Sequence, residues 1–192
     1  MEEFIQHMIN GITIGAFYAL VALGYTMVYG VLRLINFAHG DMFMWGAYLG
    51  WTTLTVLLVA VVRAGPLLLI PAFIMAMITV ALIGVLIERV AYRPLRRASR
   101  LAPIISALGA AFVLESVARN VWGASYKVYP AGLVPHIEWR LLGNVRIGVE
   151  QVAVMVISLL LMAGLYLFVQ YTKVGTAMRA VSLDHDTSRL MG

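Results

Sequence analysis

The sequence contains no cysteine and few charged residues, and each scarcity excludes a class of protein. Without cysteine there is no disulfide framework, no thiolate metal site and no thiol nucleophile. Charged residues make up 12% and hydrophobic residues 62% of the 192 residues, whereas a soluble domain is about one quarter charged and about half apolar. Together with a mean hydropathy of +0.91, this composition indicates a membrane protein.

Motifs for nucleotide hydrolysis and for metal-dependent catalysis are also missing. No Gly-x-x-x-x-Gly-Lys-Ser/Thr sequence occurs, so ATP hydrolysis by the P-loop route would need a separate subunit. His39 and Asp41 are accompanied by no His-Glu-x-x-His sequence and no second cluster of metal ligands. No nucleophile and base pair can be named. We therefore expect a protein that is not an enzyme and that uses no metal and no cofactor.

Apolar runs long enough to cross about 30 Å of hydrocarbon as helices dominate the chain. They predict an all-α, polytopic membrane fold with about five transmembrane helices, at residues 8–32, 42–62, 64–87, 104–122 and 151–172. Pro71 lies inside the third run, where neighbouring helices would have to satisfy the carbonyl that its missing N–H leaves unpaired. Little of the chain remains outside these runs, so no soluble domain is expected.

Basic residues concentrate in one short connection, at residues 88–103, and they predict the orientation of the chain. The connection contains Arg89, Arg93, Arg96, Arg97 and Arg100. Because such loops stay in the cytoplasm, the N-terminus and residues 123–150 are predicted to be external. The segment 34–41 and the tail from Lys173 are then cytoplasmic. The formal net charge of +5 comes mainly from this cluster, so it indicates membrane orientation and no nucleic-acid partner.

Residues 34–41, with the sequence LINFAHGD, bring an amide, an imidazole, a glycine and a carboxylate between two apolar runs. Irregular backbone at membrane depth is tolerated only against protein or a water-filled cavity, so this discontinuous segment is a candidate wall of a translocation path. Asn36 and His39 would share one face of a helix. The alternative is an ordinary cytoplasmic connector, in which Asp41 caps a helix that begins at Met42. Spacing alone leaves both interpretations open.

Glu115 and Arg119 form a candidate intramembrane polar pair within the run 104–122. An isolated charge at the bilayer centre costs about 2.5–3.5 kcal/mol on insertion scales, and an ion pair at this helical spacing lowers that cost. One interpretation places the pair on a polar route through the membrane. In the other, Arg119 extends to the outer surface near Trp122 and Glu115 follows it.

The tail, residues 173–192, is amphipathic. Its apolar side includes Met178, Val181, Leu190 and Met191, and its polar side Arg179, Asp184, Asp186 and Arg189. A cytoplasmic helix of this kind either lies on the lipid surface or docks into the groove of a partner. Because basic residues are few and acidic residues many for a binder of anionic lipid, docking is the better inference.

Three stretches match motifs of one transporter family. They are residues 10–50, which include INFAHGD at 35–41, the sequence ERVAYRPLR at 88–96, and ISALG at 105–109. These stretches closely resemble bacterial branched-chain amino-acid ABC-transporter permeases of the high-affinity leucine/isoleucine/valine system. The resemblance covers almost the whole chain and is weakest at about residues 123–150. It implies a multi-pass permease of the bacterial inner membrane that imports branched-chain amino acids.

The resemblance also implies partners and site residues. The partners are a second homologous permease, two ATP-binding subunits, a periplasmic amino-acid-binding protein and membrane lipid. The motif near the translocation path corresponds to Asn36, Phe37, His39 and Gly40. The coupling loop that docks an ATPase corresponds to the segment 173–192, with Gly175, Arg179, Ala180, Asp184, Leu190, Met191 and Gly192 as its matching positions.

Two departures from the family pattern affect this expectation. Ser182 and Ser188 stand where relatives usually have alanine, which would weaken close packing against an ATPase. Relatives also continue beyond the coupling loop through further spans. Residues 1–192 are therefore expected to be part of a permease domain, and the chain an incomplete permease.

Two other functions remain open. The first is a permease of the related urea or short-amide importers, whose members tend to carry methionine where Phe37 stands here. The second is a small passive channel or a structural membrane subunit without an ATPase partner.

Overall fold

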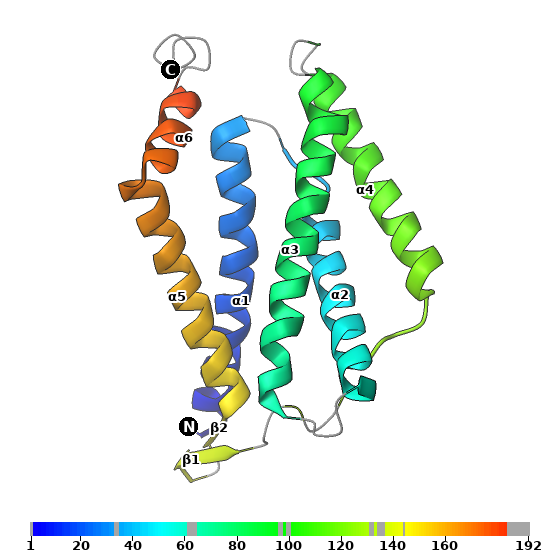
Figure 1. Cartoon of the computed structure of the whole chain (residues 1–192). Helices are drawn as coiled ribbons and strands as arrows, with labels where there is room; N and C mark the ends of the chain where they lie inside the picture. The colour runs from blue at the N-terminus through cyan, green and yellow to red at the C-terminus, as the bar shows by residue number, and fades with distance from the viewer. Residues whose placement is uncertain are drawn as a thin grey trace. The chain divides into compact units, whose positions relative to one another are not determined.

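The computed structural model describes residues 2–32, 35–60, 65–95, 98, 101–130, 133, 137–143 and 145–183. Its elements are α1 (Glu2–Leu32), α2 (His39–Ala60), η1 (Pro66–Leu68), α3 (Leu69–Ile87), η2 (Glu88–Tyr92), η3 (Arg93–Leu95), α4 (Leu101–Trp122), β1 (Glu138–Leu142), β2 (Val145–Gly148), α5 (Val149–Tyr171) and α6 (Lys173–Leu183) (Figure 1). They form two compact units, one of Met1–Arg33 with His136–Gly192 and one of Leu34–Pro135.

Within the described residues, four helices are long and apolar enough to cross a membrane. They are Glu2–Gly30, Pro66–Leu95, Leu101–Trp122 and Val149–Tyr171. The prediction of an all-α, multi-pass membrane fold is thereby confirmed. The predicted span 42–62 is not among the four; it includes Val61 and Val62, which lie outside the described residues, and so it stays a prediction.

In the unit formed by the two ends of the chain, α1 and α5 lie side by side and run in the same direction (Figure 1). Strands β1 and β2 pair antiparallel just before α5 begins. This hairpin is absent from the sequence-based prediction, because each strand is only four or five residues long and its alternation of polar and apolar residues extends over no more than four positions. Its turn contains Gly143 at φ 55°, a conformation that glycine adopts without steric cost.

The other unit contains α2, α3 and α4. α2 packs against α3 near Gly46, where an added Cβ would make an ordinary van der Waals contact with Val80 at 3.7 Å. Two indole N–H groups join α2 to α4: Trp45 donates to the Leu114 carbonyl at 3.0 Å and Trp122 to the Thr52 hydroxyl at 2.7 Å. Partly buried groups bonded in this way fix how the two helices pack.

The residues 123–130 that follow α4 are fixed against α2. The Tyr129 hydroxyl donates to the Ala47 carbonyl at 2.7 Å, and the Trp51 indole donates to the Val128 carbonyl at 2.9 Å. Partial burial raises the pKa of Tyr129 above its ordinary value, so this phenol stays a donor at neutral pH. The segment therefore follows the surface of α2 through defined hydrogen bonds.

Pro71 lies within the candidate span Pro66–Leu95, as predicted, but near its start. It lies in the first turn of α3, directly after η1, where the N–H that proline lacks is one that a helix start leaves unpaired in any case. Neighbouring helices therefore need not satisfy a freed carbonyl in mid-membrane.

Candidate functional site

The segment around residue 36 is a break between helices. α1 ends at Leu32 and α2 begins at His39, so Asn36 and His39 do not share a helical face. The new helix starts where the His39 N–H donates to the Asn36 carbonyl at 3.2 Å and the Met42 N–H donates to the Ala38 carbonyl at 2.9 Å. The expectation that the helix begins at Met42, capped by Asp41, is wrong.

Asp41 instead lies in the first turn of α2, where a negative charge still favours the positive end of the helix dipole. The helix starts earlier because Ala38 is completely buried, at 0% exposure, and its carbonyl accepts the first i to i+4 hydrogen bond of the helix.

The predicted path residues differ in their surroundings. Asn36 is 8% exposed, whereas Phe37 is 42% exposed, Gly40 is exposed and His39 is half-buried. Asn36 and Phe37 are adjacent in the chain, but the first side chain is buried and the second is exposed. A buried amide requires a hydrogen-bond partner, and the structure supplies one.

That partner is Tyr92, which the sequence reasoning did not select. Its hydroxyl donates to Oδ1 of Asn36 at 2.6 Å, and Tyr92 is itself buried. Tyr92 closes η2, a π-helical turn at the end of α3. The signal available in the sequence was a tyrosine inside the motif 88–96, but that motif was interpreted for its charge and its family resemblance, not for a hydrogen bond.

Glu115 and Arg119 form the predicted ion pair, with Nη2 and Oε1 2.5 Å apart. Both side chains are exposed on α4. The pair is therefore confirmed as an interaction, and its role on a polar route stays a prediction.

The coupling-loop residues Gly175 and Arg179 lie on α6, close to the end of α5. The Thr172 hydroxyl accepts from the Gly175 N–H at 3.0 Å and donates to the Phe168 carbonyl at 2.6 Å. One side chain thus caps the end of α5 and the start of α6. Gly175 is buried against α5, and a Cβ there would lie 2.2 Å from the Val169 carbonyl oxygen.

Arg179 strengthens the same elbow, which we define as residues 168–179. Its guanidinium donates to the side-chain oxygen and to the backbone carbonyl of Gln170, each at 3.1 Å. A cation at this position also favours the negative end of the α5 dipole. The side chain thereby fixes the angle of α6, on which Ala180 is exposed one residue further on. The remaining predicted coupling residues, Asp184, Leu190, Met191 and Gly192, lie outside the described residues.

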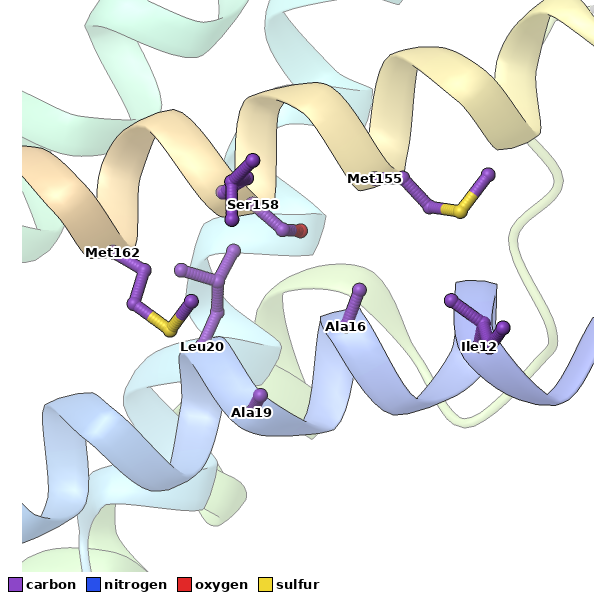
Figure 2. A pocket seen from close by; sticks show the side chains of 8 residues that line it. Ile12, Ala16, Ala19, Leu20, Met155, Ser158 and Met162 are labelled. Carbon is purple, nitrogen blue, oxygen red and sulfur yellow. The ribbon is translucent and has the colours of Figure 1, made fainter.

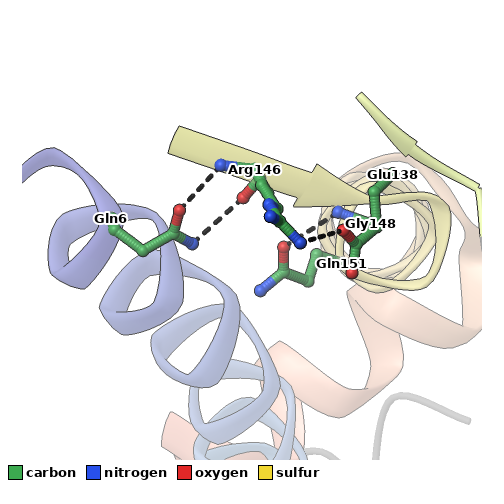
Figure 3. A network of polar contacts seen from close by, with 5 residues as sticks. All are labelled: Gln6, Glu138, Arg146, Gly148 and Gln151. Carbon is green, nitrogen blue, oxygen red and sulfur yellow. Dashed lines mark hydrogen bonds and ion pairs between the residues drawn. The ribbon is translucent and has the colours of Figure 1, made fainter. Parts of the chain in front are cut away.

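A polar network joins the start of α1 to the hairpin (Figure 3). The Gln6 carboxamide accepts from the Arg146 N–H at 2.8 Å and donates to the Arg146 carbonyl at 3.0 Å. Gln151 accepts from the Gly148 N–H at 3.1 Å, and the Arg146 guanidinium pairs with Glu138 at 3.2 Å. These bonds hold the hairpin on the ends of α1 and α5.

An open, apolar crevice of about 240 Å³ lies between α1 and α5 (Figure 2). It is lined by Ile12, Ala16, Ala19, Leu20, Met155, Ser158, Leu159 and Met162. Ser158 is its only polar residue and is 6% exposed. The crevice offers no charged group to a zwitterionic ligand.

No cluster of three or more histidine, aspartate or glutamate residues that could hold a metal ion occurs in the part of the chain that the structure describes.

Apolar helices, a polar break and a capped amphipathic end define the chain as a multi-pass membrane protein. Residues 7–192 match the family described as branched-chain amino acid transport system, permease component. The chain belongs to this family.

Relatives from bacteria and from an archaeon agree with this assignment. The high-affinity branched-chain amino acid transport system permease protein BraD of Pseudomonas aeruginosa is 37% identical over 99% of this chain and 62% of its own length. The corresponding permease protein LivH of Escherichia coli K12 is 36% identical over 98% of this chain and 62% of its own length. A probable permease protein LivH of Methanocaldococcus jannaschii is 28% identical over 90% of this chain and 53% of its own length.

The chain thus spans less than two thirds of the length of these curated relatives. No solved structure matches it significantly.

Proposed function

We propose that this protein is the permease subunit of an ATP-driven importer of branched-chain amino acids, and that residues 1–192 belong to its permease domain. The observation that carries the proposal is the family match over residues 7–192, together with the transport function that the names of relatives at 36–37% identity give. Those names favour branched-chain amino acids over urea or short amides. ATP hydrolysis is assigned to separate subunits, because the chain has no P-loop.

The break before α2 and the first turn of α2 are proposed as part of the translocation path, with Asn36 and Phe37 in the break and His39 and Gly40 in that turn. Backbone of this irregular kind is stable at membrane depth only beside protein or a water-filled cavity. The buried Asn36 amide, paired with the Tyr92 hydroxyl, supports this interpretation over that of a solvated connector. Glu115 and Arg119 are a second polar candidate on α4.

The parallel arrangement of α1 and α5 indicates that the chain connecting them crosses the membrane a third time, in addition to α3 and α4. The chain leaves α1 on one side of the membrane and enters α5 from the other side, so an odd number of spans must connect them. α3 and α4 supply two. We therefore assign the remaining crossing to α2 and retain the topology with an external N-terminus and a cytoplasmic tail.

The elbow at residues 168–179 is proposed to present α6 to an ATPase subunit. Its cap at Thr172, the close approach at Gly175 and the Arg179 bonds to Gln170 make α6 a rigid continuation of α5. Movement of a docked ATPase would then be transmitted from α6 to α5, because the bonds of the elbow hold the two helices at a fixed angle. The proposed partners are a second permease, two ATP-binding subunits and a periplasmic amino-acid-binding protein.

Uptake of radiolabelled leucine tests the proposal. The protein is expressed with these partners in a bacterial strain that lacks its own branched-chain amino acid transport. We expect uptake that requires ATP hydrolysis and that unlabelled isoleucine and valine suppress. Uptake of urea but not leucine would replace the substrate assignment, and equilibration of leucine without ATP hydrolysis would identify a passive channel.

A further inference from the structure

α3 is an uncharged helix that two arginines follow directly. Leu69–Ile87 contains no charged residue among its 19 residues. At a rise of about 1.5 Å per residue this helix is about 28 Å long, which matches the roughly 30 Å of hydrocarbon in a bilayer. Arg89 lies in η2 and Arg93 in η3, immediately beyond that length. Their guanidinium groups are therefore at the depth of the lipid phosphates.

The exposed side of this helix carries an apolar strip that leads to the arginines. Residues four apart are neighbours on one side of a helix. Arg89 and Arg93 are exposed and continue the row that begins at Val85. The strip consists of apolar side chains that are 49% to 68% exposed, namely Leu82, Val85, Leu86 and Val90. One face of residues 82–93 is therefore apolar over most of its length and cationic at its end.

The opposite side of η2 fixes this orientation. The Tyr92 hydroxyl donates to Oδ1 of Asn36 at 2.6 Å, and Tyr92 is buried. The Ser106 hydroxyl donates to the Ala91 carbonyl at 2.8 Å. All of these residues belong to the unit Leu34–Pro135. The bonds hold η2 against the rest of that unit and leave the side with the arginines facing outward.

Arg89 and Arg93 have no hydrogen bond or ion pair within the described residues. Arg119 and Arg146, by contrast, each pair with a glutamate. Glu88 directly precedes Arg89, but consecutive residues of a helix do not face each other, and among the described residues it pairs with neither arginine. Two guanidinium groups four residues apart suit a phosphate, which arginine binds through paired hydrogen bonds.

We propose that the exposed face of residues 82–93 binds one anionic phospholipid, whose phosphate lies between Arg89 and Arg93 and whose acyl chain follows the apolar strip. The strip favours a lipid over the acidic surface of a soluble subunit, because the strip lies at hydrocarbon depth. The two cations favour an anionic headgroup over a zwitterionic one. The predicted orientation puts this end of α3 in the cytoplasmic leaflet, where anionic lipids attract basic residues beside a span. The proposal is independent of the transported substrate.

Native mass spectrometry of the purified protein in detergent micelles tests the proposal, because it resolves each bound lipid. The probes are phosphatidylglycerol and phosphatidylcholine with identical acyl chains, added in equal amounts. We expect the native protein to bind one phosphatidylglycerol in preference to phosphatidylcholine. Arg89→Gln and Arg93→Gln should each weaken the binding of this phosphatidylglycerol about fivefold. The double variant should bind the two lipids equally.

Matched controls separate the site from net charge and from the headgroup alone. Arg140→Gln removes the same charge from another exposed arginine without a partner among the described residues, on β1, and should leave the preference unchanged. The double change Arg89→Lys with Arg93→Lys keeps both charges and should retain most of the preference. Dihexanoyl phosphatidylglycerol, which has the same headgroup and short chains, should bind about tenfold more weakly or less. Inorganic phosphate should not displace the long-chain lipid.

Four results would overturn the proposal. The first is equal binding of the two long-chain lipids by the native protein. The second is the same loss in Arg140→Gln as in Arg89→Gln, which would reduce the effect to net charge. The third is displacement by inorganic phosphate, which would identify a free-anion site. The fourth is a preference that disappears when the protein is purified with its co-expressed partners, which would assign this face to a subunit contact. None of these results depends on leucine uptake, so the proposed function is tested separately.

Discussion

The elbow between α5 and α6 predicts that a single methyl group at residue 175 displaces α6. The Cβ of Gly175→Ala would lie 2.2 Å from the Val169 carbonyl oxygen and 2.5 Å from the Phe168 carbonyl oxygen. Ordinary contacts begin at 3.4 Å, and the opposing atoms are backbone, which cannot rotate away as a side chain can. α6 must therefore move by about 1 Å, a displacement comparable to the overpacking of a core.

The size of the effect follows from two opposing terms. Overpacking costs about 1–3 kcal/mol, and replacement of glycine by alanine inside a helix regains up to about 1 kcal/mol. Since the clash involves rigid atoms, we expect a net loss of about 2 kcal/mol in the docking of α6 on α5. The Gly175 N–H bond to Thr172 and the Arg179 bonds to Gln170 should weaken with it.

Two measurements check this expectation. Thermal unfolding of the purified complex should occur several degrees lower in Gly175→Ala, and less ATP-binding subunit should co-purify with it. Gly164→Ala is the matched control, because Gly164 lies on α5 with nothing within 4 Å of its added Cβ. It should leave both measurements unchanged or slightly raise the unfolding temperature. Equal behaviour of the two variants would refute the close-approach argument.

Two further predictions concern the membrane-spanning helices. If α2 crosses the membrane, the single-cysteine variants Glu3→Cys and Tyr126→Cys react with an impermeant maleimide from the same side of the membrane. Reaction from opposite sides would exclude that crossing. The sequence contains no native cysteine that would also react. Glu115→Gln should lower the unfolding temperature of the complex by several degrees, because it leaves Arg119 unpaired in a span, where a lone charge costs about 2.5–3.5 kcal/mol. Adding Arg119→Gln should restore most of that loss, and a double variant no more stable than Glu115→Gln would argue against the pair.

Composition and hydropathy predicted the helices well because the bilayer constrains length and polarity together. α4 ends at Trp122 as predicted, and α5 occupies Val149–Tyr171 against a predicted 151–172. Helix starts were placed less accurately. α2 begins at His39 because the buried Ala38 carbonyl accepts its first i to i+4 hydrogen bond, a packing effect that spacing does not reveal.

The candidate site was predicted only in part. Asn36 and Gly175 were selected by resemblance, but the sequence did not show why these residue types occur there. The Asn36 amide pairs with a tyrosine hydroxyl from a segment far away in the chain. Gly175 is required by the angle between α5 and α6, which brings it against the α5 backbone. Tyr92 was missed because the motif that contains it, with Arg89, Arg93 and Arg96, was interpreted for charge and for family resemblance. A useful signal is that a buried amide in an apolar chain needs a hydroxyl partner elsewhere in the sequence.

The Gln6 carboxamide has a consequence for how the hairpin meets other chains. It bonds to both the N–H and the carbonyl of Arg146, as a neighbouring strand would, and so occupies the outer edge of β2 at that residue. Exposed strand edges are templates for pairing with foreign strands, and proteins protect them by covering them. A side chain of α1 here provides that protection. A partner that adds a strand to this hairpin is thereby directed away from Arg146 and toward β1.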